Sequence, residues 1–522
     1  AGLATMPWLS AQETPSGDLR TISILHTTDS HGNVLPTHSY KGTPDLGGLA
    51  RCAAQIRKWR EENPYSIVVD VGDVYQGTAV GWMTRGRLMI DLFNKIGYDA
   101  WVLGNHEFDW GPEVVIDALS RSSMPVMTAN MRLDGTLAGG FEDQTHPLAR
   151  VKPHVIRVIG GFKIGLIGLV TPGLPYWLPD ALRQGFEAVD PVESLRAQVR
   201  LLREENKVDA VVACGHMGWR ERDDFANPVN AMLREESGVD VYIAGHSHQD
   251  HPSRNIDRVL YTQAGYWGIH CGRVDLTFDM QSRRLVEKRA RTVLMDKSIA
   301  GDPVVLEASA KSLGEASAYL AREIGELKGT FVAEQPSPGM GGSQHKLLSA
   351  AFEWHARQQG LAVDGVFHKV FREQEVGPGV KTVADAWELL PYDDGLVVLQ
   401  LTHEELVSVL NESLEAGDKW ALFGFETVVV ENEAPKFRKK GGRFVTSLRT
   451  LRSPEAPAEA RFSIICSSYD VQSGGKRLMR LRALAERAGD EKALLPLNSR
   501  EALIEFFLAQ KVIKLRDIEK SG

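Results

Sequence analysis

The sequence predicts a layered α/β domain followed by a second, separate α/β domain. Through the first half of the 522 residues, apolar runs such as SIVVDVGD and KIGLIGLVTP alternate with helix-like segments. Continuous Val/Ile runs are typical of strands covered on both faces, so we expect a mostly apolar inner sheet. A Pro/Gly/Ser stretch, EQPSPGMGGS, then interrupts the chain, and the segments beyond it alternate more, as in RFSIICSSYD. The change in pattern indicates a second domain.

We expect four parts along the chain. They are an N-terminal tail at residues 1–19, the first domain at 20–300, a connecting helix at 301–328, and the second domain at 329–522. The helix prediction rests on a segment rich in Ala, Leu, Glu and Lys, with Asp302 as its cap and Pro303 at its first position. The tail turns from apolar to polar after Leu9-Ser10-Ala11, which is typical of the remnant of an export signal. We therefore expect a periplasmic or secreted protein.

Composition excludes several classes of protein. The net charge of −8 gives no basic stripe for a nucleic-acid backbone, so we expect no nucleic-acid partner. Apolar runs stay shorter than the roughly 18 residues that a membrane span needs. The four cysteines are far apart and form no CxxC pair, which argues against a thiolate zinc site. We expect a monomer or a dimer that acts on a small molecule.

Polar side chains follow the predicted strands directly, at the point where ligands bind in open α/β folds. They are Asp29 and His31 after TISILHTT, Asp73 after SIVVDVG, Asn105, His106 and Asp109 after WVLG, His216 after VDAVVACG, and His246 and His248 after VDVYIAG. Imidazole, carboxylate and carboxamide groups together suit divalent Mn, Zn, Fe or Co. The ordered set predicts a centre with two divalent metal ions.

The spacing of these residues suggests which of them could bind the same metal. Asp29 and His31 share a face because they are two residues apart, so they form a natural pair on one metal. His246 and His248 have the same spacing and could reach either metal. Asp73 is a candidate to bridge two ions about 3.5–4 Å apart, because a carboxylate has two oxygens to share.

The neighbours Asn105 and His106 are expected to have different roles. Asn105 offers a neutral carbonyl ligand. The adjacent side chain diverges from it, so His106 is better suited to donate a proton or to stabilise the charge of a reacting phosphoryl group. Asp109, three residues further on, would hold the imidazolium form.

The segments LHTTDSHG, DVGDVYQG, LGNHEFDWG, CGHMG and AGHSHQ resemble the calcineurin-like metallophosphoesterase superfamily. The chain is more closely similar to the secreted 5'-nucleotidase family, of the bifunctional UDP-sugar hydrolase/5'-nucleotidase type. The resemblance implies a four-layer α/β/β/α catalytic domain, a connecting helix and a substrate-binding α/β domain. It also implies hydrolysis of phosphate esters by attack of a metal-bound hydroxide on phosphorus.

The resemblance assigns the site residues one by one. One metal takes Asp29, His31, Asp73 and His248, the other takes Asp73, Asn105, His216 and His246, and His106 and Asp109 match the catalytic dyad. Family members vary at the last position of the GHSH segment, where some have Gln. A His at position 248 lies within that variation.

The second domain departs from the family pattern in its substrate-binding blocks. FHKVFRE stands where the family has Asn-Gly-Gly-Gly-Ile-Arg, so only Arg372 is retained. Tyr469 and Trp420 match the aromatic residues that stack on a base, although core packing is an equal alternative for both. Lys476 stands in place of a ribose-binding Asp, and an ammonium group can only donate hydrogen bonds. Lys476 would favour an extra anionic group on the substrate, or it lies in an exposed turn.

The expected function is metal-dependent hydrolysis of a nucleotide or a related small phosphate ester. An alternative keeps the same metal site but acts on a sugar phosphate, a cyclic nucleotide or, as a thiosulfohydrolase, on a sulfur carrier. A non-catalytic binding protein is the third interpretation, and the complete ligand set argues against it.

Overall fold

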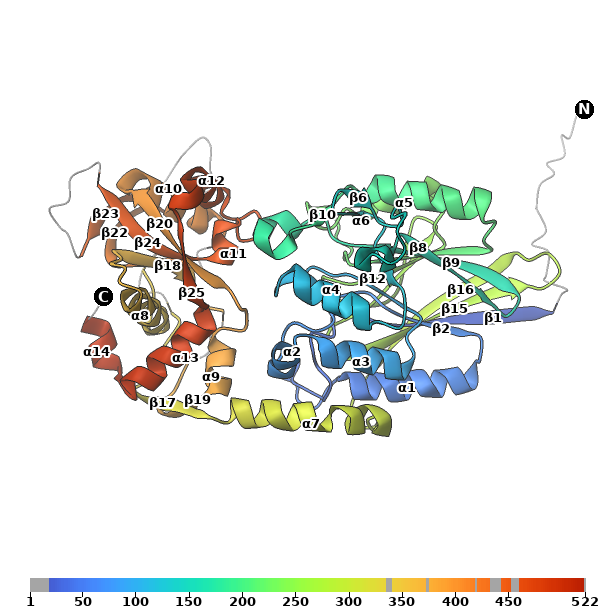
Figure 1. The fold of residues 1–522 in the computed structure, drawn as a ribbon, viewed down its shortest axis with the longest axis horizontal. Coiled ribbons are helices and arrows are strands. Elements are labelled where there is room, and N and C mark those ends of the chain that lie inside the picture. Colours follow the sequence, from blue (N-terminus) through green and yellow to red (C-terminus); the bar gives the residue numbers. More distant parts are fainter. Residues whose placement is uncertain are drawn as a thin grey trace, which may run out of the picture.

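The computed structural model describes residues 18–334, 340–371, 375–417, 420–431, 443–451 and 460–520. Two α/β domains lie side by side along the molecule and are joined by one long helix, α7 (Pro303–Leu320) (Figure 1). This two-domain α/β architecture confirms the fold class that the sequence predicts. The first described element is β1 (Leu19–Thr27), so the predicted signal remnant lies outside the described residues.

The first domain contains two sheets packed face to face. One has the order β16 (Leu285–Leu294), β15 (His270–Asp279), β1, β2 (Ser66–Asp70), β3 (Ala100–Val102), β4 (Val126–Met127) and β7 (Val151–Lys152). The other has the order β13 (Asp250–Ile256), β14 (Val259–Ala264), β12 (Val241–Ala244), β11 (Ala210–Gly215), β9 (Phe162–Leu169) and β8 (His154–Ile159). Ile24 of β1 and Val212 of β11 belong to one buried apolar cluster between the sheets.

Helices cover the outer face of each sheet. The first sheet carries α1 (Leu49–Glu62), α2 (Ala79–Thr84), α3 (Arg87–Ile96) and α4 (Pro112–Arg121), and the second carries α5 (Pro191–Arg200), the π-helical turn Leu201–Glu205 and α6 (Val229–Met232). A small sheet of β10 (Phe186–Ala188), β5 (Met131–Leu133) and β6 (Thr136–Leu137) lies at one side. The layers therefore follow the expected order α/β/β/α.

The parallel strands bring their carboxyl ends to one edge of the domain. β1, β2 and β3 pair in parallel in the first sheet, and β9, β11 and β12 do so in the second. Because the two sheets face each other, the loops after these strands meet. This is where every predicted metal ligand lies.

The second domain is built on a five-stranded sheet with helices on both faces. The sheet order is β21 (Trp420–Phe423), β18 (Gly365–Lys369), β24 (Arg461–Ser467), β20 (Gly395–Thr402) and β25 (Ala493–Asn498). The helices are α8 (Ser343–Gln358), α9 (Val383–Leu389), α10 (His403–Glu415), α11 (Ser468–Val471), α12 (Met479–Ala488), α13 (Ser499–Gln510) and α14 (Leu515–Lys520). A hairpin of β22 (Phe425–Glu431) and β23 (Arg443–Thr450) and a three-stranded sheet of β19 (Gly379–Thr382), β17 (Glu323–Lys328) and β26 (Val512–Lys514) complete it.

The connecting helix is shorter than the sequence predicts. Its start is as expected, because the Asp302 carboxylate accepts hydrogen bonds from the backbone N–H groups of Val304 and Val305 at 2.8 and 3.1 Å. The prediction that it continues to residue 328 is wrong, since Glu323–Lys328 form β17. Leu327 is fully buried in the second domain, and β17 pairs with both β19 and β26, so tertiary pairing overrides the helical composition.

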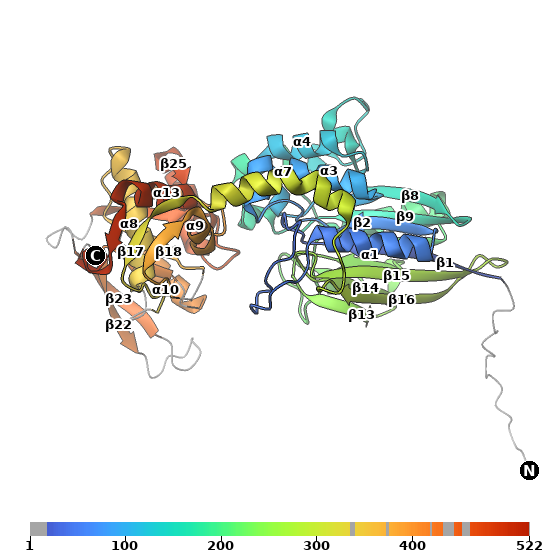
Figure 2. The ribbon, with the colours of Figure 1, turned by 90° about the horizontal axis from the view of Figure 1, so that it is seen from below.

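Helix α7 lies along the helices of the first domain before it enters the second (Figure 2). Near its end, the ring of Tyr319 stacks on Trp82 of α2 at 5.6 Å between centroids. In the described part of the chain, no helix is long and apolar enough to cross a membrane.

Candidate metal centre

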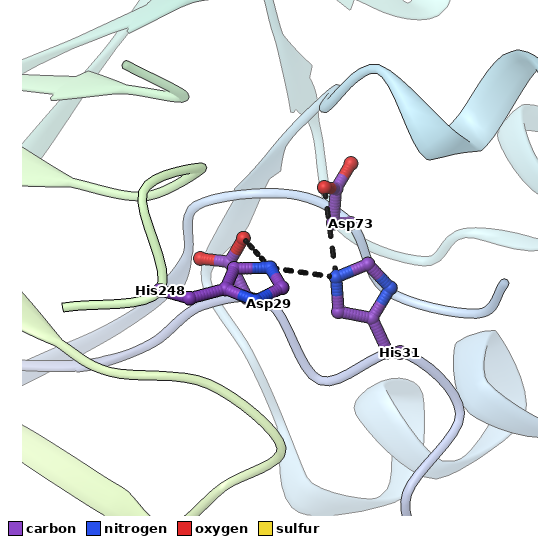
Figure 3. A group of neighbouring side chains, drawn as sticks. All are labelled: Asp29, His31, Asp73 and His248. Carbon is purple, nitrogen blue, oxygen red and sulfur yellow. Dashed lines mark hydrogen bonds and ion pairs between the residues drawn. The ribbon is translucent and has the colours of Figure 1, made fainter. Parts of the chain in front are cut away.

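Four predicted ligands converge at the edge where the two sheets meet. The ligand atoms of Asp29, His31, Asp73 and His248 all lie within 4.8 Å of one another (Figure 3). His248 Nε2 is 3.2 Å from Asp29 Oδ1 and 3.0 Å from His31 Nε2. His31 Nε2 is 3.7 Å from Asp73 Oδ2. The three loops that follow β1, β2 and β12 thus direct their side chains to one point.

A second group shares Asp73 with the first. Ligand atoms of Asp73, His216 and His246 also lie within 4.8 Å of one another, and His216 Nε2 is 3.0 Å from Asp73 Oδ2. Asn105, the fourth residue expected at this position, follows β3 and lines the same cavity as His246. The placement of Asp73 between both groups is the one that a bridging carboxylate requires.

Several buried atoms of these residues fit a cation. Among the described residues, Asn105 Oδ1 is buried without a hydrogen-bond partner, although buried polar groups normally have one, and the buried Asp73 Oδ2 and His216 Nε2 face each other at 3.0 Å. A carboxylate oxygen and a carboxamide oxygen both accept rather than donate. A shared divalent ion would satisfy them together, so the donor set fits the metals that the sequence implies.

The orientation of two imidazoles supports the same conclusion. His31 Nδ1 lies 2.8 Å from Gln76 O, and His216 Nδ1 lies 2.6 Å from Val71 O. A backbone carbonyl only accepts, so each Nδ1 carries the proton and each Nε2 is left to face the cluster.

Electrostatics differ between these two imidazoles. Burial lowers the pKa of His31 to about 4, which keeps that ring neutral. Burial also opposes charge on His216, but the Asp73 carboxylate outweighs it and raises the pKa to about 9. A divalent ion that binds His216 and Asp73 together must displace this proton, so binding there depends on pH.

The loops that carry the ligands have strained backbones. Asp29, His31, Asp73, His246 and His248 have φ of 50°, 47°, 55°, 71° and 56°. The left-handed region costs a residue other than glycine on the order of 1 kcal/mol and is concentrated at functional sites. These turns aim side chains sharply inward from strand ends, which an extended backbone would not do.

Glu107 is a buried residue of the site that sequence reasoning missed. Its carboxylate accepts hydrogen bonds from the backbone N–H groups of Asp73, Val74 and Gly104 at 2.9, 2.7 and 2.6 Å. It ties the loop after β2 to the loop after β3. The only sequence signal was its position beside His106 in the GNHEFDWG block.

His106 and Asp109 form a pair beside the two groups of ligands. His106 Nδ1 lies 2.7 Å from Asp109 Oδ2, and the His106 backbone N–H donates to Asp73 Oδ1 at 2.9 Å. Burial opposes charge on the imidazole, but Asp109 and Asp73 outweigh it and raise the pKa of His106 to about 10. The ring is therefore cationic at neutral pH, as a group that stabilises a phosphoryl oxygen should be.

A cavity of about 360 Å³ opens over this pair, between the two domains. The first domain contributes Asn105, His106, Asp109, His246 and an apolar wall of Trp177, Leu178, Pro179 and Leu182. The second contributes Lys369, Phe371, Tyr392, Asp393, Asp394, Ser468, Tyr469 and Arg477. Trp110 Nε1 donates to Asp393 Oδ2 at 2.8 Å across the boundary, so the domains are joined next to the cavity.

The predicted substrate-binding residues have different positions. Tyr469 lines the cavity, where its hydroxyl accepts a hydrogen bond of 2.9 Å from Arg477. Trp420 does not: its side chain is 1% exposed and its indole N–H donates to Asp470 at 3.0 Å, so core packing is the correct interpretation. Lys476 is exposed and holds its ammonium 4.2 Å from the ring centre of Tyr176, outside the cavity lining. Arg372 lies outside the described residues.

Comparison with known proteins agrees with this geometry. The calcineurin-like phosphoesterase family matches residues 22–250. The chain is 28% identical to a snake venom 5'-nucleotidase of Gloydius brevicauda over 62% of this chain and 57% of that protein. It is also 28% identical to a 5'-nucleotidase of Bos taurus over 58% of this chain and 54% of that protein. The matches thus span little more than half the length of these relatives.

Solved structures extend the likeness to almost the whole chain. A 5'-nucleotidase precursor of Thermus thermophilus superposes with a TM-score of 0.71 at 24% identity, over 95% of this chain and 97% of that one. The sulfate thiohydrolase SoxB of the same species does so with a TM-score of 0.63 at 17% identity, over 96% of each chain. At such identities the likeness establishes the fold. Residues 22–250 thus form a calcineurin-like phosphoesterase domain, and nearly the whole chain has the fold seen in solved 5'-nucleotidase structures.

Proposed function

We propose that the protein hydrolyses small phosphate monoesters, 5'-nucleotides among them, with two divalent ions. Asp29, His31, Asp73 and His248 would hold one ion, and Asp73, Asn105, His216 and His246 the other. The observation that carries the proposal is the buried Asp73 carboxylate, which belongs to both groups of ligand atoms: its Oδ2 lies 3.7 Å from His31 Nε2 and 3.0 Å from His216 Nε2. Two ions at this place would polarise a phosphoryl group and lower the pKa of water.

The residues around the ions would stabilise the reacting phosphoryl group, limit the access of water and bind the organic part of the ester. His106, held as a cation by Asp109 at 2.7 Å, faces the cavity and can donate a hydrogen bond to a phosphoryl oxygen or to the leaving group. The apolar wall from Trp177 to Leu182 limits the access of bulk water on one side. Tyr469 offers an aromatic ring for the organic part of the ester.

The names of the relatives support a nucleotide substrate, and the venom relatives support export of the protein. A second candidate, a non-nucleotide phosphate ester or a sulfur-carrier substrate, is favoured by one observation. Trp420 is in the core and Lys476 lies on Tyr176, so two of the three candidate substrate-binding residues that the structure describes do not line the cavity. This candidate function is placed second because Tyr469, the other aromatic residue expected to stack on a base, does line the cavity.

A substrate panel tests the proposal. The purified chain is assayed with Mn²⁺, Zn²⁺, Co²⁺ or Mg²⁺ against 5'-nucleotides, cyclic nucleotides, sugar nucleotides, sugar phosphates and an aryl phosphate. We expect phosphate release from 5'-nucleotides that depends on the added metal. Cyclic and sugar nucleotides release no inorganic phosphate when they are hydrolysed, so their products are separated by chromatography. Hydrolysis confined to the esters other than 5'-nucleotides favours the second candidate, and no hydrolysis of any ester with any metal contradicts both phosphate-ester proposals. Fractionation of the native host tests export.

A further inference from the structure

Tyr40 contacts one of the proposed metal ligands from a surface loop. The loop connects β1 to α1, and its Tyr40 side chain is 61% exposed. The Tyr40 hydroxyl lies 2.8 Å from Nδ1 of His248, the ring nitrogen that faces away from the ligand group. Neither the motifs of the sequence nor the comparisons point to this residue.

The hydrogen-bond partner of His248 Nδ1 differs in kind from the partners of His31 Nδ1 and His216 Nδ1. His31 and His216 place Nδ1 against backbone carbonyls, which only accept, so their tautomers are fixed. A tyrosine hydroxyl can both accept and donate. If Tyr40 accepts from Nδ1–H, Nε2 of His248 has a free lone pair for a metal. If Tyr40 donates instead, the proton is on Nε2, which points at His31 Nε2 at 3.0 Å and cannot bind a metal.

The Tyr40 hydroxyl is held in place by its surroundings. Its ring stacks on Tyr266 at 4.4 Å between centroids and lies 4.7 Å from Trp267, while its backbone N–H donates to the Tyr266 hydroxyl at 3.1 Å. His248 itself stacks on Tyr266 at 5.4 Å. The loop is therefore packed against the same aromatic surface that supports the ligand.

From this arrangement we infer that Tyr40 is a positioning residue for His248, and that the β1–α1 loop thereby sets the affinity of the metal held with Asp29, His31 and Asp73. The inference rests on the proposed two-metal site. The expected effect of Tyr40 is on one of the two ions only. Among the contacts of the described residues, Tyr40 touches none of the proposed ligands of the other ion, which are Asp73, Asn105, His216 and His246.

The test is a titration of the metal-stripped full chain with Mn²⁺, in which free Mn²⁺ is followed by electron paramagnetic resonance. Tyr40→Phe retains the ring and removes only the hydroxyl. We expect wild type to bind two equivalents and Tyr40→Phe to bind one of them about 10- to 100-fold more weakly, as is typical when the outer partner of a ligating His is lost. Tyr65→Phe is the matched control: it removes a phenol hydroxyl from a ring that the Arg20 guanidinium covers at 4.6 Å, and its isotherm should superpose on that of wild type.

A double-mutant cycle separates this role from a general structural one. His248→Ala should weaken the same step, and adding Tyr40→Phe to it should weaken that step no further. The inference is overturned if Tyr40→Phe binds Mn²⁺ like wild type, or if it weakens binding equally with and without His248. If wild type binds no Mn²⁺, the two-metal proposal fails as well, so the wild-type isotherm tells the two failures apart. Circular dichroism of each variant verifies the fold.

Discussion

Alanine at Gly104 should weaken binding at both proposed metal sites, because it displaces a single shared carboxylate. A Cβ atom at Gly104 would lie 2.2 Å from Asp73 Oδ1 and 2.5 Å from the Asp73 backbone nitrogen, where ordinary contact begins at 3.4 Å. Gly104 does not have a positive φ, so the effect is steric rather than one of backbone strain. Asp73 would have to shift by about 1 Å, several times the roughly 0.2 Å within which metal–ligand distances are kept.

We expect Gly104→Ala to weaken Mn²⁺ binding at both sites by more than about 100-fold, since Asp73 is shared. The overpacked loop should cost about 1–3 kcal/mol in the free energy of unfolding. Mn²⁺ titration and urea denaturation measure the two effects. Gly314→Ala in α7 is the control: its Cβ meets nothing within 4 Å, so it should leave metal binding intact and stabilise the helix by up to about 1 kcal/mol. Two equivalents of Mn²⁺ bound to Gly104→Ala with wild-type affinity would refute the reasoning.

Three further predictions concern residues around the cavity. His106→Ala should keep both metals and lower kcat by about 10²- to 10⁴-fold; loss of bound metal in a Mn²⁺ titration would show that His106 is a ligand instead. Burial opposes charge on His106, and Asp109 is the first of the groups that raise its pKa to about 10, so Asp109→Asn should lower that pKa and move the alkaline limb of the pH–kcat profile to lower pH. Coincident alkaline limbs would contradict this role. Asp393→Ala leaves the Arg500 side chain, which is 4% exposed, without its carboxylate and should cost about 3–5 kcal/mol in urea denaturation. Asp180→Ala removes a carboxylate that is 91% exposed and paired with Arg183, and should cost under about 1 kcal/mol. Equal costs would show that burial of the carboxylate does not decide the value of the pair.

The convergence of the proposed metal ligands could be predicted from the sequence, because each ligand is positioned by the end of its own strand. Each ligand follows directly on an apolar strand, and parallel strands place such positions at one edge of a sheet whatever the loop lengths. Asp73 and His248 therefore came together as expected, although 175 residues separate them.

The substrate cavity could not be predicted in the same way. Its walls come from two domains, and residues such as Trp177, Lys369 and Tyr392 meet only because of how those domains pack. The role of Trp420 stayed open between base stacking and core packing, because a stacking aromatic and a core aromatic have the same local pattern. The predicted end of the connecting helix was wrong for a related reason. The segment 323–328 has helical composition, but it forms a strand whose pairing partner β26 lies almost 190 residues away.

The left-handed backbones of the ligand loops bear on which residue types suit these positions. Their conformational cost is set by chain geometry and is present whether or not a metal is bound. Glycine adopts φ near 50–70° without that cost. At these positions the residue with the least backbone strain is therefore one that has no side chain to bind a metal. Five residues other than glycine at such positions therefore support the proposal that their side chains are what this edge of the sheet requires.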